Sequence, residues 1–254
     1  MASHPQLEPP AVASASVVGR GRLGPVIARA LRAAGIEVHG PTGRDEPVAA
    51  TDVVLLCVPD AAIAEAAAAA RAQAGPGILI GHTSGATPIA GTGVDFGLHP
   101  LQTFVGDETP DVFQGIGFGI AGATPAALET ARELATRLGG RAVPIADEQR
   151  AAYHAAASIA SNFTVTLLAA AEQVAASAGF AADDARALLA PLVRRTVDNW
   201  ASHGPGRALT GPVARGDAQT VARQREAVAS GAPALLPLFD ALAASTADLA
   251  KGTA

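Results

Sequence analysis

A glycine-rich turn near the start of the chain restricts its fold more than any other feature. Residues 19–24 read Gly-Arg-Gly-Arg-Leu-Gly. A short apolar strand is predicted just before them at Ser16–Val18, and the apolar spacing of Pro25–Ala34 predicts a helix just after them. Between a strand and a helix, a G-x-G-x-x-G sequence indicates dinucleotide binding rather than an ordinary turn.

Each glycine of this turn has a separate expected role. Gly19 permits the tight turn, Gly21 lets the backbone approach a pyrophosphate, and Gly24 lets the helix pack close to the sheet. Free N–H groups and the positive end of the helix dipole would hold the phosphates. The remaining motif residues are expected to line the same site: Arg20, Arg22 and Leu23.

The rest of the first half alternates strands with helices, which predicts a doubly wound parallel sheet. Asp52–Val58 is almost continuously apolar, as expected of a parallel strand buried on both faces. A helix is predicted at Thr124–Gly139. The other predicted strands are Ile36–His39, Gly77–Gly81, Phe96–His99, Gly117–Gly122 and Arg141–Ile145.

The second half shows helical periodicity alone. The fold class is therefore α/β, with an N-terminal Rossmann-type sheet followed by an all-α C-terminal domain. We expect a disordered tail at 1–15, a nucleotide-binding domain at 16–146 and a helical substrate or dimerisation domain at 147–254. The predicted helices are Asp147–Gly179, Ala181–Ser202, Asp217–Ser230 and Ala234–Ala250. Such alanine-rich helices pack closely, within one chain or across a homodimer seam.

Composition excludes several classes of protein. A net charge of −5 does not give the basic face that nucleic-acid binding needs. The one cysteine, Cys57, allows no disulfide within the chain, which favours a cytoplasmic location. We see no charge-free apolar run long enough to predict a membrane span. Lys251 is the only lysine, so no mechanism that needs an interior lysine is open to this chain.

The segment after the second predicted strand bears on cofactor choice. NAD-binding domains usually place an acid here, about 20 residues after the glycine motif, for the ribose hydroxyl. This chain has Gly-Pro-Thr-Gly-Arg at 40–44, so Thr42 and Arg44, with Arg20, could bind a 2′-phosphate instead. We therefore expect NADP rather than NAD. Asp45 would be the acid if the strand ran further.

Polar groups are expected where ligands bind in open α/β sheets, beyond the carboxyl ends of the strands. Val58, Pro59 and Ser84 lie at such positions and are predicted to contact the cofactor. His99 and Gln102 follow another strand and are predicted to contact substrate. A histidine at a strand end is, however, often structural. Neither His82 nor His99 has a cysteine or carboxylate at metal-ligand spacing, so we expect no metal.

A polar stripe crosses the first predicted long helix. His154, Ser158 and Asn162 are spaced by four residues and would share one face, with Ser161 beside them. Asn162 needs a buried partner or a ligand, because asparagine is a poor helix former. His154 lies next to the only tyrosine, Tyr153. The serines could equally serve close helix packing.

A loop near the C-terminus offers further candidates. Thr210 and Arg215 would reach substrate if they face the cleft, with Arg215 anchoring a carboxylate. The alternative is a purely structural loop in which Asp217 caps the following helix.

Taken together, these motifs resemble an uncharacterised bacterial family whose members pair a Rossmann-like oxidoreductase domain with a C-terminal helical domain of unknown function. The resemblance covers nearly the whole chain after Ser16. It rests on residues 17–24, Cys57-Val58-Pro59-Asp60, His82-Thr83-Ser84-Gly85, residues 99–104, Tyr153-His154-Ala155-Ala156 through Ser161-Asn162, and Thr210-Gly211-Pro212.

The layout is also similar to the 6-phosphogluconate dehydrogenase-like superfamily, which includes β-hydroxyacid dehydrogenases, ketopantoate reductases, pyrroline-5-carboxylate reductases and prephenate dehydrogenases. That resemblance implies NAD(P)-dependent hydride transfer, a helical substrate side and often a dimer. Two of these groups carry a catalytic lysine four residues before an asparagine. If the asparagine is Asn162, that position holds Ser158.

Two functions follow from these observations. The first is an NADP-dependent oxidoreductase acting on a small oxo or hydroxy acid or an imine. His154 would be the general acid/base, Asn162 would orient the substrate and His99 would be a second polar contact. The second is a dinucleotide-binding sensor or partner protein without catalysis, because a fold does not fix a function.

Overall fold

The computed structural model describes residues 11–75 and 77–252. These residues form two compact units, which divide between Ser161 and Asn162. We call them the first unit and the second unit. The predicted tail at 1–15 falls largely outside the described residues. Ser14 and Ala15, which the prediction placed at the end of this tail, belong to the opening strand. The strand therefore starts two residues earlier than predicted.

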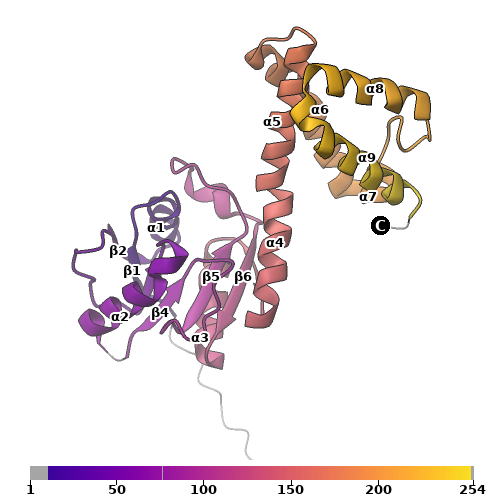
Figure 1. Cartoon of the computed structure of the whole chain (residues 1–254). Coiled ribbons are helices and arrows are strands. Elements are labelled where there is room, and N and C mark those ends of the chain that lie inside the picture. The colour runs from indigo at the N-terminus through magenta and orange to yellow at the C-terminus, as the bar shows by residue number, and fades with distance from the viewer. Residues whose placement is uncertain (1–10, 76, 253–254) are drawn as a thin grey trace, which may run out of the picture. The chain divides into compact units, whose positions relative to one another are not determined.

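The first unit is built on a seven-stranded sheet with the order β2-β1-β3-β4-β5-β6-β7 (Figure 1). All neighbouring strands are parallel except β5 and β6, which are antiparallel. This corrects the expectation of a wholly parallel sheet: β6 and β7 run opposite to the other five. The strands are β1 Ser14–Val18, β2 Glu37–Thr42, β3 Val53–Leu56, β4 Leu79–His82, β5 Phe96–Pro100, β6 Gly117–Gly122 and β7 Arg141–Pro144.

Hydrophobic side chains cover both faces of this sheet. One core cluster joins β1, β5 and β6 to helices α1 (Leu23–Ala33) and α3 (Pro125–Arg137). A second cluster joins β3 and β4 to α2 (Ile63–Ala74). Alternate residues of each strand point to opposite faces, so the buried strands are apolar at nearly every position, as the run at 53–56 shows.

The strand order reverses at β1, which lies between β2 and β3. Ligands of open α/β sheets bind beyond the carboxyl ends of the strands at such a reversal. The fold therefore places the glycine-rich turn, which follows β1, at the expected position.

The predicted helix at 147–179 is two helices. Helix α4 (Arg150–Ala160) still belongs to the first unit, and α5 (Asn162–Ser177) opens the second. The break is at Ser161, whose ψ of −75° departs from helical geometry. The predicted domain boundary at 146 thus lies before α4, whereas the compact units divide after it.

The second unit contains helices alone among its described residues. Helix α6 runs without a break through Pro191. Asp217 caps α8 by accepting a hydrogen bond from the Thr220 N–H, as predicted. The helices after α5 are α6 Ala182–His203, α7 Pro205–Ala208, α8 Ala218–Gly231 and α9 Leu236–Ala250.

One helical stretch of the described chain, 147–177, is long and apolar enough to cross a membrane by composition, with a mean hydropathy of 1.2. The sequence reading had expected no such stretch. A single such stretch is weak evidence for a membrane span. This stretch also begins with an Asp147–Arg150 ion pair that packs on the first unit.

Candidate active site

The glycine-rich turn has the geometry that its sequence predicts. Gly19 has a φ of +114°, and a Cβ there would lie 2.1 Å from the carbonyl oxygen of Cys57. A Cβ on Gly24 would lie 1.9 Å from the carbonyl oxygen of Gly19. Gly21 is different, because a Cβ there would meet nothing within 4 Å. The first and last glycines are needed to form the turn, and the middle one faces open space.

The start of α1 is suited to an anion. Arg22 occupies its N-cap position without a side-chain hydrogen bond to the helix, and the first turn has no acidic residue. The first N–H groups of a helix have no partner within it, and the helix dipole favours negative charge there. The residues present therefore fit a dinucleotide pyrophosphate beside Gly21.

A cavity of about 380 Å³ lies beside this turn. It extends from the ends of β1 and β3 to α2, at the reversal of strand order. Val58 and Pro59 line it, as the sequence predicts for cofactor contacts. Its charged lining residues are Arg44, Asp45, Glu46 and Glu65.

Glu46 is the acid that sequence reasoning missed in this cavity. Its Oε2 atom lies 2.6 Å from Nη2 of Arg20 and accepts a hydrogen bond of 3.1 Å from the Gly43 N–H. Asp45, the alternative acid that the sequence offered, lines the same cavity. Arg44 lies 3.9 Å from Glu65, and the Thr42 hydroxyl donates to the Val17 carbonyl at 3.4 Å.

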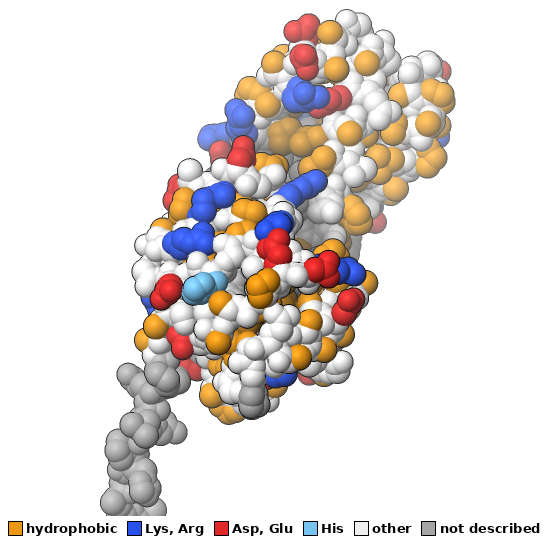
Figure 2. Space-filling view, turned by 90° about the vertical axis from the view of Figure 1, so that its left-hand side faces the viewer, with side chains coloured by type: hydrophobic (Ala, Val, Ile, Leu, Met, Phe, Trp, Pro, Cys, Tyr) orange, Lys and Arg blue, Asp and Glu red, His pale blue; other side chains and the backbone are white. Residues whose placement is uncertain are grey.

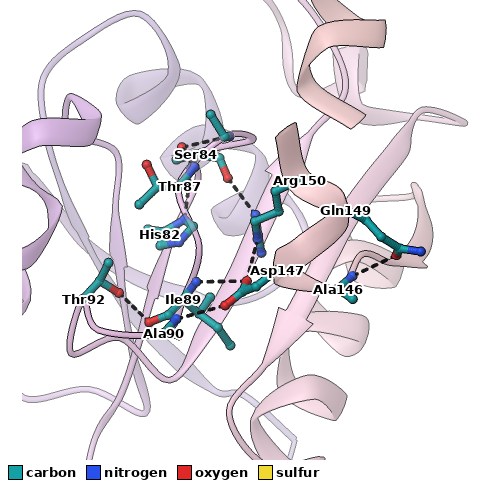
Figure 3. A network of polar contacts seen from close by, with 11 residues as sticks. His82, Ser84, Thr87, Ile89, Ala90, Thr92, Ala146, Asp147, Gln149 and Arg150 are labelled. Carbon is teal, nitrogen blue, oxygen red and sulfur yellow. Dashed lines mark hydrogen bonds and ion pairs between the residues drawn. The ribbon is translucent and has the colours of Figure 1, made fainter. Parts of the chain in front are cut away.

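A second polar group lies at the carboxyl end of β4 (Figure 3). His82 is fully buried, and its Nδ1 accepts a hydrogen bond of 3.2 Å from the Ser84 N–H. The Ser84 hydroxyl accepts from the N–H groups of Ala86 and Thr87 at 3.2 and 2.9 Å. Ser84, predicted to touch cofactor, thus shapes the turn after β4.

Arg150 is a buried cation that the sequence did not single out. Its Nε donates to Asp147 at 2.9 Å, and Asp147 also accepts the N–H groups of Ile89 and Ala90 (Figure 3). Arg150 is 2% exposed, and its Nη2 has no hydrogen-bond partner. From sequence, an arginine three residues after an aspartate resembles an ordinary surface ion pair, so no signal marked it.

His99, Tyr153 and His154 come together beside this network. Nδ1 of His99 and the Tyr153 hydroxyl are 2.8 Å apart. The rings of His99 and His154 are 6.3 Å apart at their centroids. A Cβ on Gly85 would lie 2.8 Å from His99 and 2.9 Å from Nδ1 of His154, so only glycine leaves room for both imidazoles.

Burial controls protonation in this cluster. It lowers the pKa of His82 to about 4, with a further contribution from the Arg150 charge. It also lowers the pKa of His99 to about 4, and the neighbouring His154 and Arg150 act in the same direction. Burial raises the pKa of Tyr153, against the opposing effect of Arg150. At neutral pH the imidazoles of His82 and His99 are therefore uncharged, and the Tyr153 phenol keeps its proton.

The other predicted residues are half-buried or exposed. Ser158 and Ser161 are half-buried, and Gln102 is exposed with its Oε1 accepting from the Thr103 N–H at 2.8 Å. Asn162 is exposed at the first position of α5, so the argument from a buried mid-helix asparagine does not hold. Thr210 and Arg215 are exposed residues of the second unit.

Among the described residues, no three His, Cys, Asp or Glu side chains gather as a potential metal site.

Tyr153 is another member of the polar cluster for which the sequence predicted no role, although it is the only tyrosine. Its position beside His154 in the sequence was the available signal.

Solved structures similar to this chain share its architecture. The "putative NADP oxidoreductase BF3122" of Bacteroides fragilis matches with a TM-score of 0.77 and 23% identity, over 93% of this chain and 98% of that one. Protein TM1727 of Thermotoga maritima matches with a TM-score of 0.75 and 23% identity, over 94% and 98%. Comparison with curated proteins finds no match.

A more distant match is the NADP-bound pyrroline carboxylate reductase of Plasmodium falciparum. Its TM-score is 0.60 at 10% identity, over 94% of this chain and 98% of that one. These matches confirm the Rossmann-like fold. A family model described as a domain of unknown function, DUF2520, matches residues 116–246, about half of the chain. The chain therefore belongs to the DUF2520 family.

Proposed function

We propose that this chain is an NADP-dependent oxidoreductase that transfers a hydride between the nicotinamide cofactor and a small oxo or hydroxy acid or an imine. One observation carries the proposal. The bare Gly21 turn and the His99–Tyr153–His154 cluster lie at the same edge of one sheet, beyond the carboxyl ends of β1 and β5. Those strands are three places apart, roughly 14 Å by the usual strand spacing.

The protein residues would bind, orient and exchange protons, while the bound cofactor would supply the hydride. We assign the exposed His154 as the acid/base group that exchanges protons with solvent, and His99 as a second polar contact. Asn162 would orient the substrate. Further substrate contacts are proposed for Ser158, Ser161, Gln102, Thr210 and Arg215.

Arg20 and Arg44 support NADP over NAD. Both lie beside the cavity next to the glycine turn and could pair with a 2′-phosphate. Such a charge-assisted hydrogen bond contributes about 1.5–3 kcal/mol. Glu46 opposes this preference, since it already pairs with Arg20 and would repel the phosphate.

Calorimetric titration with NADPH and NADH tests the binding site. We expect micromolar or tighter binding of NADPH by the wild-type chain. Gly21→Ala should lose at least tenfold in affinity while its melting temperature stays unchanged, because its Cβ meets no protein atom. Gly77→Ala, also at an open glycine but away from this turn, is the matched control. Absence of heat with both nucleotides in folded protein would contradict the proposal.

Turnover tests the chemistry. NADPH oxidation is followed against a panel of 2-oxo acids, 3-oxo acids and cyclic imines. On whichever member reacts, His154→Ala should reduce turnover by about 10²–10⁴-fold, the usual contribution of an acid/base group in the proton transfer. If His154→Ala turned over that substrate as fast as wild type, the role of His154 would be wrong.

A non-catalytic dinucleotide sensor is the second candidate. It is favoured by Ser158, a half-buried serine. If Asn162 corresponds to the asparagine of the β-hydroxyacid dehydrogenases and ketopantoate reductases, Ser158 takes the place of their catalytic lysine. Tight NADPH binding without turnover of any panel member would support the sensor.

We also propose a second copy of the chain as a partner and the cytoplasm as its location. The second unit supports the dimer, because large apolar side chains remain exposed on α5 and α6. Among them are Phe163, Val165, Leu188, Leu192 and Trp200.

A further inference from the structure

Tyr153, the only tyrosine of the chain, makes a polar contact through its hydroxyl that a purely structural aromatic residue would not need. The Tyr153 hydroxyl is 2.8 Å from Nδ1 of His99, and the two rings meet edge to face at 88°. Tyr153 comes from α4 and His99 from β5, so residues 54 positions apart meet through their polar atoms. A phenylalanine at 153 could make the ring contact without the hydroxyl.

Two bare glycines shape the space around this pair. A Cβ on Gly119 of β6 would lie 2.8 Å from the Tyr153 hydroxyl oxygen, so that position must be bare for the phenol to reach the sheet. Gly85 clears the space shared by His99 and His154 in the same way. The phenol and the two imidazoles therefore form one continuous polar group, whose outer member, His154, is exposed.

The charges around the phenol favour its role as an acid. Arg150, on the same helix, lowers the Tyr153 pKa and so opposes the effect of burial. The Gly119 N–H on β6 also lowers this pKa. His99 on β5 is uncharged, because burial lowers its pKa to about 4 although Asp60 acts in the opposite direction. The phenol is thus protonated at neutral pH, beside a cation that would stabilise its phenolate.

We propose that Tyr153 is the group that gives the proton to the substrate oxygen or nitrogen during reduction, with His99 returning a proton to it. This rests on the proposed function. The bound cofactor would supply the hydride for the new C–H bond, and the C=O or C=N π electrons would form an O–H or N–H bond with the phenol proton. The products are the reduced substrate, the oxidised cofactor and a Tyr153 phenolate.

His99 can restore the phenol without becoming charged. Its Nδ1–H donates to the phenolate while its Nε2 accepts a proton from the side of His154 and solvent. Nε2 lies 2.8 Å from the position that a Gly85 Cβ would occupy, on the side facing His154. A neutral relay of this kind agrees with the low pKa of His99, which disfavours an imidazolium intermediate.

The single tyrosine makes the test direct. Growth on 3-fluorotyrosine labels Tyr153 alone and gives one ¹⁹F resonance, with a phenol acidic enough to titrate while the protein stays folded. We expect its pKa to be lower with the oxidised nucleotide bound than with the reduced one, because only the oxidised nicotinamide is positively charged. Arg150→Met should raise that pKa, and Arg150→Lys should restore it in part.

The possible outcomes separate the two proposals. No ¹⁹F change and no calorimetric heat with either nucleotide would contradict the proposed function itself. Binding without a difference between oxidised and reduced nucleotide would place Tyr153 away from the nicotinamide and overturn this inference alone. That comparison uses the chain without any substitution, so it stands even if Arg150→Met fails to fold.

Turnover gives the second arm of the test. On any reactive substrate, Tyr153→Phe should lower turnover by about 10²–10⁴-fold with an unchanged NADPH Kd. Gly119→Ala, which displaces the hydroxyl but keeps the phenol, should lower turnover in the same direction. Turnover of Tyr153→Phe within threefold of wild type would overturn the inference.

Discussion

The two units differ sharply in how much apolar surface they bury. Among the described residues, every fully buried hydrophobic side chain except Ala185 and Val228 belongs to the first unit. The second unit leaves large apolar side chains exposed, including Trp200 at 58% and Phe163 at 55%. Figure 2 shows hydrophobic side chains exposed among acidic and basic ones on one face of the chain.

This difference indicates that the units are stabilised in different ways. A sheet covered on both faces by helices encloses its own core, whereas a few alanine-rich helices cannot bury their larger side chains alone. Exposed apolar patches of this kind mark interaction surfaces. The first unit should therefore fold on its own contacts, and the second should gain much of its stability from a second copy.

A matched pair of phenylalanine substitutions, one in each unit, tests this comparison and should give the largest effect. Phe96→Ala removes a fully buried ring that covers bare Gly81, and we expect a loss of about 3–5 kcal/mol in the unfolding free energy. Phe163→Ala removes an exposed ring and should cost about 0.5 kcal/mol or less. Urea unfolding at low protein concentration, where copies are dissociated, measures both. Equal losses would contradict the comparison.

Acid should destabilise the first unit selectively. The pKa of His82 is lowered from 6.5 to about 4 by burial, so folding disfavours its protonation. Its contribution to stability is complete above pH 6.5 and falls as the pH drops towards 4, by roughly 3 kcal/mol at about 1.4 kcal/mol per pKa unit. His99 acts in the same direction.

Unfolding curves between pH 7 and 4 measure this slope. His82→Gln should flatten it whatever its effect on stability at pH 7. The second unit contains one histidine, His203, which is exposed. An acid transition of equal size in helices of the second unit would show that the buried histidine is not its cause.

The proposed dimer predicts an effect of intermediate size, on the free energy of self-association through the second unit. Trp200→Ala should weaken self-association by about 2 kcal/mol or more, roughly thirtyfold, because buried tryptophans dominate interfaces. Sedimentation velocity gives the dissociation constant, and the single tryptophan reports the same event through its emission. Val105→Ala, 75% exposed in the first unit, is the control. A wild-type chain that stays monomeric at high concentration would contradict the dimer.

The sequence predicted the first unit well because its signals are local. A strand, a glycine turn and a helix follow one another within residues 14–33, and β6 lies at the predicted Gly117–Gly122. The antiparallel pairing of β5 with β6 was missed, because strand direction depends on which strands meet in space. The break at Ser161 was missed because alanine-rich sequence reads as helical on both sides of it.

The candidate site was only partly predictable for the same reason. His99 and His154 were found as polar residues at a strand end and on a helix. Their contact depends on bare Gly85, whose role appears only when β5 and α4 are placed together. Arg150 and Glu46 looked like surface charges, and only the fold shows one buried and the other paired with Arg20.

The prediction with the smallest effect tests whether residues of the first unit alone determine the preference between NADPH and NADH. Glu46 holds Arg20 and the Gly43 N–H, two donors that a 2′-phosphate would need. Glu46→Gln removes the charge and frees Arg20, so the ratio of NADH to NADPH dissociation constants should rise about tenfold, or about 1.4 kcal/mol. Asp45→Asn removes the same charge one residue away and should change that ratio less than threefold. Trp200→Ala should leave it unchanged. An equal shift in both acid variants would mean that general electrostatics, rather than the Arg20–Glu46 pair, sets the preference.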